Sequence, residues 1–282
     1  MRRKRYFCVA NITYASLDKT YRRILEVIGA TVNGKPTNAG ILFFSDRPQD
    51  FIPNAYVRLV VFRGEDMLEY MDRRDFSGPL WKIVEDFENY MMQYMARMGA
   101  IVSFRRIEKY EYPLEALREA LVNALTHRNY FDPGDVRVFI CPFKIVFINP
   151  GSFPPGVSPD KPTHKPRNPI LSQYMYDMGF MEKYGVGIIR MKQLCAASRI
   201  KLTYSLDSFE TRLTFSRIVA TLDDIERKIM DLIAEESLSS SQLASRLGVS
   251  KDTVLRRINR LIQLDLVKRI GYGKSTRYIA NL

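Results

Sequence analysis

Hydrophobic positions along the chain recur with the periods of both helices and strands, and predict a mixed protein. Apolar residues three and four positions apart predict helices over residues 17–30, 76–98, 113–129, 170–177 and 188–197. Runs of β-branched and aromatic residues predict strands over residues 40–44, 55–62, 136–140 and 144–148, and two more within 201–216. The expected fold class is therefore mixed, α/β (α+β), with a sheet packed against helices.

The C-terminal part of the chain has a pattern of its own. Three short amphipathic helices are predicted over residues 223–235, 241–247 and 251–263, followed by strands over 266–270 and 275–279 that flank a glycine-rich turn. Ser239 or Ser240 is placed to cap the second helix and Ser250 to cap the third, because a serine hydroxyl accepts from the first free amides. This order of elements is typical of a winged helix-turn-helix domain.

Positive charge is concentrated in the same region. The chain has 43 Lys and Arg against 31 Asp and Glu, a net charge of +12. From Ser237 to the end there are nine basic and two acidic residues, a net charge of +7. Because the phosphate backbone of nucleic acid attracts such a surface, the expected partner is double-stranded DNA.

The third helix of this domain is the expected recognition helix. Its buried stripe consists of Val254, Ile258 and Leu261, and polar residues occupy the opposite face. The residues expected to contact DNA from this helix and the hairpin are Lys251, Asp252, Thr253, Arg256, Arg257, Arg260, Lys274 and Arg277. The alternative is that the charged face is only solvated and the winged helix binds protein.

Other features narrow the class of protein. No run of about 18 apolar residues predicts a membrane helix, and the apolar segment after Arg5 is too short for a signal peptide. Three widely spaced cysteines do not imply a disulfide framework, and two histidines without clustered cysteines do not imply a zinc site. We expect a cytoplasmic protein, and a homodimer because winged-helix regulators commonly bind DNA as symmetric dimers.

Residues 119–130, EALVNALTHRNY, resemble the N-box of the GHKL ATPase-like domain. This form of the N-box resembles the one found in transcriptional regulators related to the RecG-like C-terminal domain. Residues 36–53 resemble the stretch of that family that follows its Schlafen-like AlbA domain, which is then truncated here. The resemblance covers about residues 10–282. It implies an α/β segment over 1–105, a GHKL-like α/β sandwich over 106–218, and the winged helix-turn-helix over 219–282.

The N-box places three polar residues on one helix face. Glu119, Asn123 and His127 follow one another at intervals of four residues, opposite a stripe of leucines. In the wider family, the glutamate at the position of Glu119 activates water, and the asparagine at the position of Asn123 holds magnesium at the phosphates. These residue types suit those roles, since a carboxylate accepts a proton and a carboxamide offers a neutral oxygen ligand. The resemblance therefore implies ATP and Mg²⁺ as cofactors.

Two further stretches carry the resemblance. Residues 148–156 follow a strand where the wider family has an Asp-x-Gly-x-Gly box; Asn149 replaces the aspartate that reads the adenine amino group, and Gly151 fits the first glycine. Residues 182–188 resemble the later glycine box, in which Gly185 and Gly187 lie near phosphate at a helix start. Arg167, in the proline-rich loop between the two boxes, and the nearby Lys165 are further candidates to meet a phosphate. An asparagine brings a donor as well as an acceptor, so a changed nucleotide preference is expected.

The sequence thus indicates a DNA-binding transcriptional regulator modulated by a nucleotide in its middle domain. Two alternatives stay open. The chain is a DNA-associated ATPase with Glu119 as general base, or it is a protein-interaction module on a degenerate ATPase fold. Phosphate release that depends on Glu119 would favour the ATPase over the regulator. Salt-dependent DNA affinity would favour a DNA-binding protein over a protein-interaction module.

Overall fold

The computed structural model describes residues 18–98, 112–161, 163, 165–182, 185–218, 222–264, 266–273 and 276–280. The chain divides into two compact units, Met1–Ser216 and Arg217–Leu282. In the described residues, no helix is both long and apolar enough to cross a membrane.

The first unit is built on a six-stranded sheet with the strand order β4-β3-β5-β6-β8-β7. The strands are β3 (Val57–Phe62), β4 (Tyr70–Phe76), β5 (Val136–Ile140), β6 (Lys144–Pro150), β7 (Ile200–Leu206) and β8 (Glu210–Arg217). Strand β3 pairs in parallel with β5, whereas β3–β4, β5–β6 and β6–β8 are antiparallel pairs. The expected mixed α+β class is confirmed.

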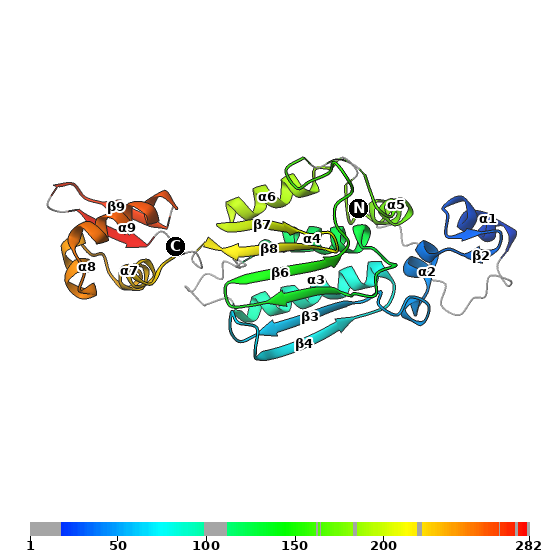
Figure 1. The fold of residues 1–282 in the computed structure, drawn as a ribbon, viewed down its shortest axis with the longest axis horizontal. Coiled ribbons are helices and arrows are strands. Elements are labelled where there is room, and N and C mark those ends of the chain that lie inside the picture. Colours follow the sequence, from blue (N-terminus) through cyan, green and yellow to red (C-terminus); the bar gives the residue numbers. More distant parts are fainter. Residues whose placement is uncertain are drawn as a thin grey trace. The chain divides into compact units, whose positions relative to one another are not determined.

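Helices cover one face of this sheet. Figure 1 shows α3 (Leu80–Met98), α4 (Leu114–His127) and α6 (Gly187–Ala197) on that face. Alternate strand residues such as Leu59, Val138 and Phe215 point into the layer between sheet and helices and are buried together with Leu117 and Leu121 of α4. The leucine stripe expected on residues 113–129 therefore faces the core, and the opposite face of α4 is left for polar residues.

The chain before β3 differs from the expectation, which contained neither its hairpin and 3₁₀ turn nor a helix between them. It forms α1 (Lys19–Val27), a hairpin of β1 (Thr31–Val32) and β2 (Lys35–Pro36), helix α2 (Asn38–Phe44) and the 3₁₀ turn η2 (Pro48–Asp50). The strand predicted over residues 40–44 is wrong, because this segment is α2. The Thr37 hydroxyl caps the helix by accepting from the Gly40 amide. Leu42 and Phe43 are buried, with the Phe43 ring 4.9 Å from that of Tyr174, so tertiary packing overrides β propensity.

A second difference concerns β4, which the hydrophobic pattern does not predict. The helix expected from residue 76 begins at Leu80, and Phe76 instead ends β4. This edge strand is mostly exposed, with Asp72, Arg73 and Asp75 along it, and so lacks the apolar alternation of a half-buried strand. Because β3 and β4 share one sheet with β5, the expected segments 1–105 and 106–218 belong to one compact unit.

Between β6 and β7 lies the proline-rich loop, followed by α5 (Pro169–Asp177) and α6. The Asn168 amide donates to the carbonyl oxygens of Thr126 (2.9 Å) and Arg128 (2.8 Å), at the C-terminal end of α4. The Lys192 ammonium donates to Pro159 O at 3.1 Å, and binds the loop to α6 as well. These contacts position the loop over the polar face of α4.

The second unit consists of α7 (Asp224–Glu235), α8 (Ser240–Leu247), α9 (Lys251–Gln263), β9 (Val267–Ile270) and β10 (Arg277–Ala280). Asp223, Ser239 and Ser250 cap the three helices through their side chains. Val254, Ile258 and Leu261 are buried in its core, as expected. The hairpin β9–β10 gains a bridge from Leu238 to Tyr278. This is the expected winged helix-turn-helix architecture.

Candidate nucleotide pocket and nucleic-acid interface

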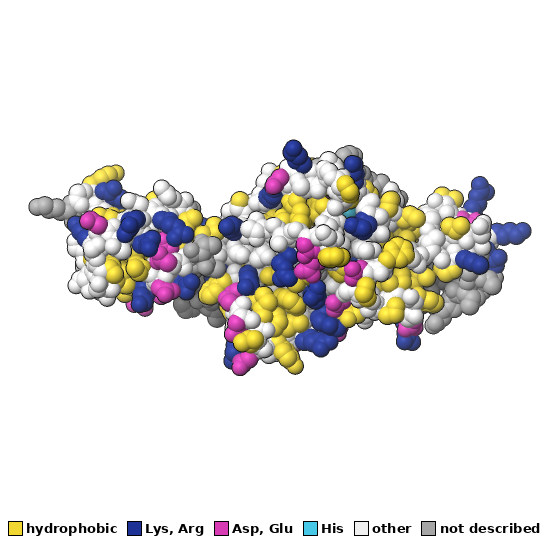
Figure 2. Space-filling view, in the orientation of Figure 1, with side chains coloured by type: hydrophobic (Ala, Val, Ile, Leu, Met, Phe, Trp, Pro, Cys, Tyr) yellow, Lys and Arg dark blue, Asp and Glu magenta, His cyan; other side chains and the backbone are white. Residues whose placement is uncertain are grey.

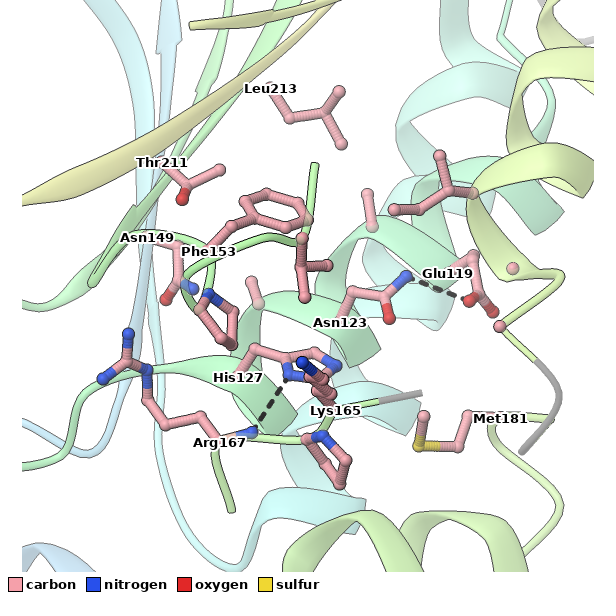
Figure 3. Close-up of a pocket in the computed structure, with 18 of the residues that line it drawn as sticks. Glu119, Asn123, His127, Asn149, Phe153, Lys165, Arg167, Met181, Thr211 and Leu213 are labelled. Carbon is pink, nitrogen blue, oxygen red and sulfur yellow. Dashed lines mark hydrogen bonds between the residues drawn. The ribbon is translucent and has the colours of Figure 1, made fainter. Parts of the chain in front are cut away.

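One pocket in the first unit brings together all nine residues that the sequence singled out for a nucleotide (Figure 3). It is a cavity of about 130 Å³ between α4, α6, the end of β6 and the proline-rich loop. The predicted residues that line it are Glu119, Asn123, His127, Asn149, Gly151, Lys165, Arg167, Gly185 and Gly187. They come from four separate stretches of the chain, and only the tertiary fold places them around one space.

Helix α4 supplies the acidic side of the pocket. The Asn123 amide nitrogen donates to Glu119 Oε1 at 2.9 Å, one helical turn away. This bond fixes the carboxamide, so that its oxygen is the atom left for a ligand or cation. In the described part of the chain, no group of three or more His, Cys, Asp or Glu is placed to hold a metal. A magnesium ion at Asn123 would therefore depend on phosphate oxygens and water for its other ligands.

The start of α6 lies directly against the Glu119 carboxylate. A Cβ at Gly187, the first residue of α6, would collide with Glu119 Oε1, so a larger residue there would displace the Glu119 carboxylate from its place against the helix start. Burial raises the pKa of the Glu119 carboxyl, and the hydrogen bond from Asn123 opposes that shift. A carboxyl with a raised pKa next to a pocket is a typical general-base candidate.

The effect of this burial on stability can be measured. Because the folded state raises the Glu119 pKa, it holds the proton at a pH where the unfolded chain has released it. We expect the unfolding free energy of wild type, relative to Glu119→Gln, to fall as pH rises from about 4.3, the ordinary glutamate value, through the folded pKa. Chemical denaturation across pH tests this, with Glu115→Gln on the same helix as control. A flat or rising difference would contradict it.

The opposite end of the pocket is formed by β6 and β8. Asn149 is 9% exposed, and its Oδ1 is buried without a hydrogen-bond partner among the described residues. Thr211 lies directly opposite it on β8. Gly151, at φ 106°, adopts a backbone conformation that favours glycine, and its amide donates to Phe209 O at 2.7 Å. A buried polar atom without a partner is the feature expected where a ligand completes the hydrogen bonding.

Cationic and aromatic residues complete the lining. Lys165 and Arg167 are exposed at the pocket edge beside His127, whose Nδ1 accepts from the Arg167 amide at 3.5 Å. The Arg167 guanidinium donates to Ser152 O at 2.7 Å. Sequence reasoning missed several lining residues that come from β6, its following loop and β7–β8, among them Phe147, Phe153, Tyr204 and Thr211. Strand register alone brings Thr211 to Asn149, and no local motif signals it.

The second candidate site is the exposed face of α9. Lys251, Asp252 and Arg256 are exposed there, and Thr253 is half-buried with its hydroxyl 2.9 Å from that of Ser250. Neither Lys251 nor Arg256 is ion-paired with a residue that the structure describes. These two cations are therefore available to an anionic partner, at the helix end that a recognition helix presents to DNA bases.

Two arginines expected at the DNA interface are paired with carboxylates at the start of α7. Arg260 Nη1 lies 2.9 and 2.8 Å from the two carboxylate oxygens of Glu226, which is 0% exposed. Arg257 Nη2 lies 2.9 Å from Asp223 Oδ2. Both guanidinium groups thus bind α9 to the capped start of α7. Both arginines remain partly exposed, and their contact with DNA stays a prediction.

The hairpin carries the remaining candidates. Arg277 is exposed and donates to Ser237 O at 3.0 Å, and Lys268 and Arg269 of β9 are also exposed. Tyr272, at the hairpin tip, is 90% exposed. Lys274 lies outside the described residues. Figure 2 shows basic side chains on this unit with acidic ones between them, in keeping with the ion pairs of α7 and α9.

Two family models match parts of the chain. Residues 134–218 match the family model described as "Putative ATP-dependent DNA helicase recG C-terminal", and residues 222–268 match that of the winged helix-turn-helix DNA-binding family. The chain therefore combines a RecG C-terminal-like, ATPase-type domain with a C-terminal winged helix-turn-helix, as expected. Neither match includes residues 1–105, which were expected to follow an AlbA-like region. The match to the ATPase-type family begins after α4, so the N-box itself lies outside it.

A solved structure with a similar fold is that of the DIP2311 protein from Corynebacterium diphtheriae. The TM-score is 0.53 at 17% sequence identity, over 95% of this chain and 65% of that one. At this identity the likeness concerns the fold, and the chain spans about two thirds of the length of that relative. No curated protein matches the chain.

Proposed function

We propose that this protein is a DNA-binding transcriptional regulator whose first unit binds a nucleotide as effector. The observation that supports nucleotide binding is that one pocket is lined by Glu119, Asn123, Asn149 and Gly187. Acidic, amide and cationic groups line its rim while apolar side chains form its walls, the composition typical of small-molecule sites. DNA binding is supported by the match to the winged-helix family and by the exposed Lys251 and Arg256 of α9.

Nucleotide binding is expected to stabilise the first unit. A ligand that binds only the folded state adds RT ln(1 + [L]/Kd), about 2.7 kcal/mol at a hundredfold excess over Kd. We therefore expect the melting temperature to rise with millimolar nucleoside triphosphate and Mg²⁺. Asn123→Ala is expected to remove the magnesium-dependent part of the shift, since the carboxamide oxygen is the proposed ligand. Scanning fluorimetry with and without Mg²⁺ measures both, and the absence of a shift with every nucleotide would contradict the proposal.

A second candidate function is hydrolysis of the bound nucleotide. The raised pKa of Glu119 and its position beside the start of α6 favour a general-base role for its carboxylate. Glu119→Gln retains the shape and an acceptor for the Asn123 amide but cannot accept a proton from water. Steady-state phosphate release that is lost in Glu119→Gln while nucleotide binding persists would assign the enzyme. Release that is equal in both proteins would exclude Glu119 as the base.

The protein-interaction alternative is tested through salt. If α9 contacts phosphates, the logarithm of duplex affinity falls linearly with the logarithm of salt concentration, because bound counterions are released. Titration of random-sequence duplex DNA by fluorescence anisotropy measures this slope. Failure to bind duplex at low salt would favour the protein-binding alternative for the winged helix.

A further inference from the structure

One stripe of α9 carries three polar side chains that the rest of the winged helix does not use. Asp252, Arg256 and Asn259 are all exposed. At about 100° per residue they lie within an arc of about 60°, opposite the buried stripe of the helix. None of the three side chains makes a hydrogen bond or an ion pair with a residue that the structure describes. This recognition stripe therefore keeps its full hydrogen-bonding capacity for a partner.

The neighbouring flank of α9 differs, because its polar side chains already have partners. Arg257 Nη2 lies 2.9 Å from Asp223 Oδ2, and Arg260 Nη1 lies 2.8 Å from Glu226 Oε2. Both carboxylates belong to the capping box at the start of α7. The two pairs therefore fix the rotation of α9 about its own axis, and hold the recognition stripe outward.

The three side chains of the stripe offer different hydrogen-bonding patterns. A guanidinium only donates, a carboxylate only accepts, and an amide does both within one flat group. In the major groove, guanine presents two acceptors and adenine presents an acceptor beside an amino donor. Because the Asn259 amide is exposed and unpartnered, it can turn its donor to adenine N7 and its acceptor to the adenine amino group. No other single base offers both groups on that edge.

Asp252 has a different match. Guanine and thymine present acceptors in the major groove, which leave a carboxylate without a donor. Adenine presents an amino donor, but its N7 acceptor lies beside that group and opposes the second carboxylate oxygen. Cytosine presents an amino donor without such an acceptor. Since phosphates repel a carboxylate, Asp252 lowers affinity for every duplex that lacks a compensating donor at this position.

We propose that Asp252 and Asn259 determine the DNA sequence that the winged helix prefers, Asn259 by binding adenine and Asp252 by accepting from the amino group of cytosine. This rests on the proposed DNA-binding function and specifies its target. Asn259 follows Asp252 by seven positions, which is about 10.5 Å along the helix axis. At about 3.4 Å per base pair, the preferred cytosine and adenine are expected about three base pairs apart.

The adenine contact is tested by enrichment of duplexes from a random pool with the full chain, followed by sequencing. Asn259→Ala is expected to abolish the adenine preference at one position and to weaken binding of the wild-type site at least about fivefold. Its affinity for random-sequence duplex is expected to stay unchanged, because no charge is lost. Gln263→Ala is the matched control. Gln263 is an exposed amide on the same side of α9, but at its last residue, and recognition helices contact bases through their N-terminal residues.

The cytosine contact is tested by Asp252→Asn, which keeps the shape and removes the charge. Affinity for random-sequence duplex is expected to rise, and the preference at this position to shift from cytosine to adenine. Asp231→Asn removes the same charge from exposed α7 and is expected to leave the preference unchanged. Circular dichroism and melting verify that each variant is folded. Wild-type base preferences in folded Asn259→Ala and Asp252→Asn proteins would overturn this proposal alone. Absence of duplex binding by the wild type would overturn the DNA-binding function as well.

Discussion

Arg256→Ala is expected to weaken duplex DNA binding without lowering the stability of the winged helix. Arg256 is exposed on α9 and has no ion-pair partner among the described residues, so its removal leaves no buried group unsatisfied. If its guanidinium contacts a guanine edge, the loss is expected to be about 1–3 kcal/mol and confined to that base. If it contacts phosphate, the loss is expected to be uniform across sequences, with a salt slope shallower by about one.

The measurement is anisotropy titration of duplexes enriched from a random pool, repeated over a range of salt. Arg227→Ala removes the same charge from α7, where Arg227 is exposed and pairs only loosely with Asp224 at 3.4 Å, and is expected to change affinity little. Arg260→Ala is the informative contrast, since it breaks the pair with buried Glu226 and is expected to lower the melting temperature of this unit. Wild-type affinity in Arg256→Ala would remove α9 from the proposed interface.

Arg128→Met is expected to destabilise the first unit by about 2–4 kcal/mol. Arg128 is 0% exposed, the largest fully buried side chain in the described structure. Its guanidinium donates to Asn54 O and, at 2.6 Å, to Gly134 O, and lies 5.0 Å from the centre of the Tyr130 ring. Methionine fills similar volume but leaves the Gly134 carbonyl without a donor, while the Asn54 carbonyl keeps only the Tyr56 amide, which donates to it at 2.8 Å. Each hydrogen bond lost from a charged donor costs about 1.5–3 kcal/mol.

Denaturant unfolding of the full chain measures this loss, and thermal melting is expected to shift by roughly 5–15 °C. Arg47→Met serves as control, because Arg47 is exposed and its single pair with Asp50 is expected to contribute less than about 1 kcal/mol. Arg128→Lys is expected to recover only part of the loss, since a compact ammonium lacks the planar fork that reaches two separate carbonyls. Wild-type stability in Arg128→Met would show that these carbonyls do not require the guanidinium.

Local sequence determined much of this protein, because local periodicity and capping are properties of neighbouring residues. The leucine stripe of α4 placed Glu119, Asn123 and His127 on the opposite face, and all three line the pocket. The serines before α8 and α9 marked the helix starts of the winged helix. Ordered motifs along the chain selected the other predicted pocket residues, although these are far apart in sequence.

Tertiary structure decided what depends on residues distant in sequence. Residues 40–44 have strand-like composition but form α2, because burial of Leu42 and Phe43 outweighs a weak local preference. Burial of Arg128 and the pairing of Arg260 with Glu226 depend on carbonyls and carboxylates that other segments supply. The partner of Asn149 is Thr211 because of β6–β8 register, which no short-range pattern encodes. Long-range packing sets the protonation, pairing and hydrogen-bonding capacity of side chains whose positions on their own helices and strands are already set locally.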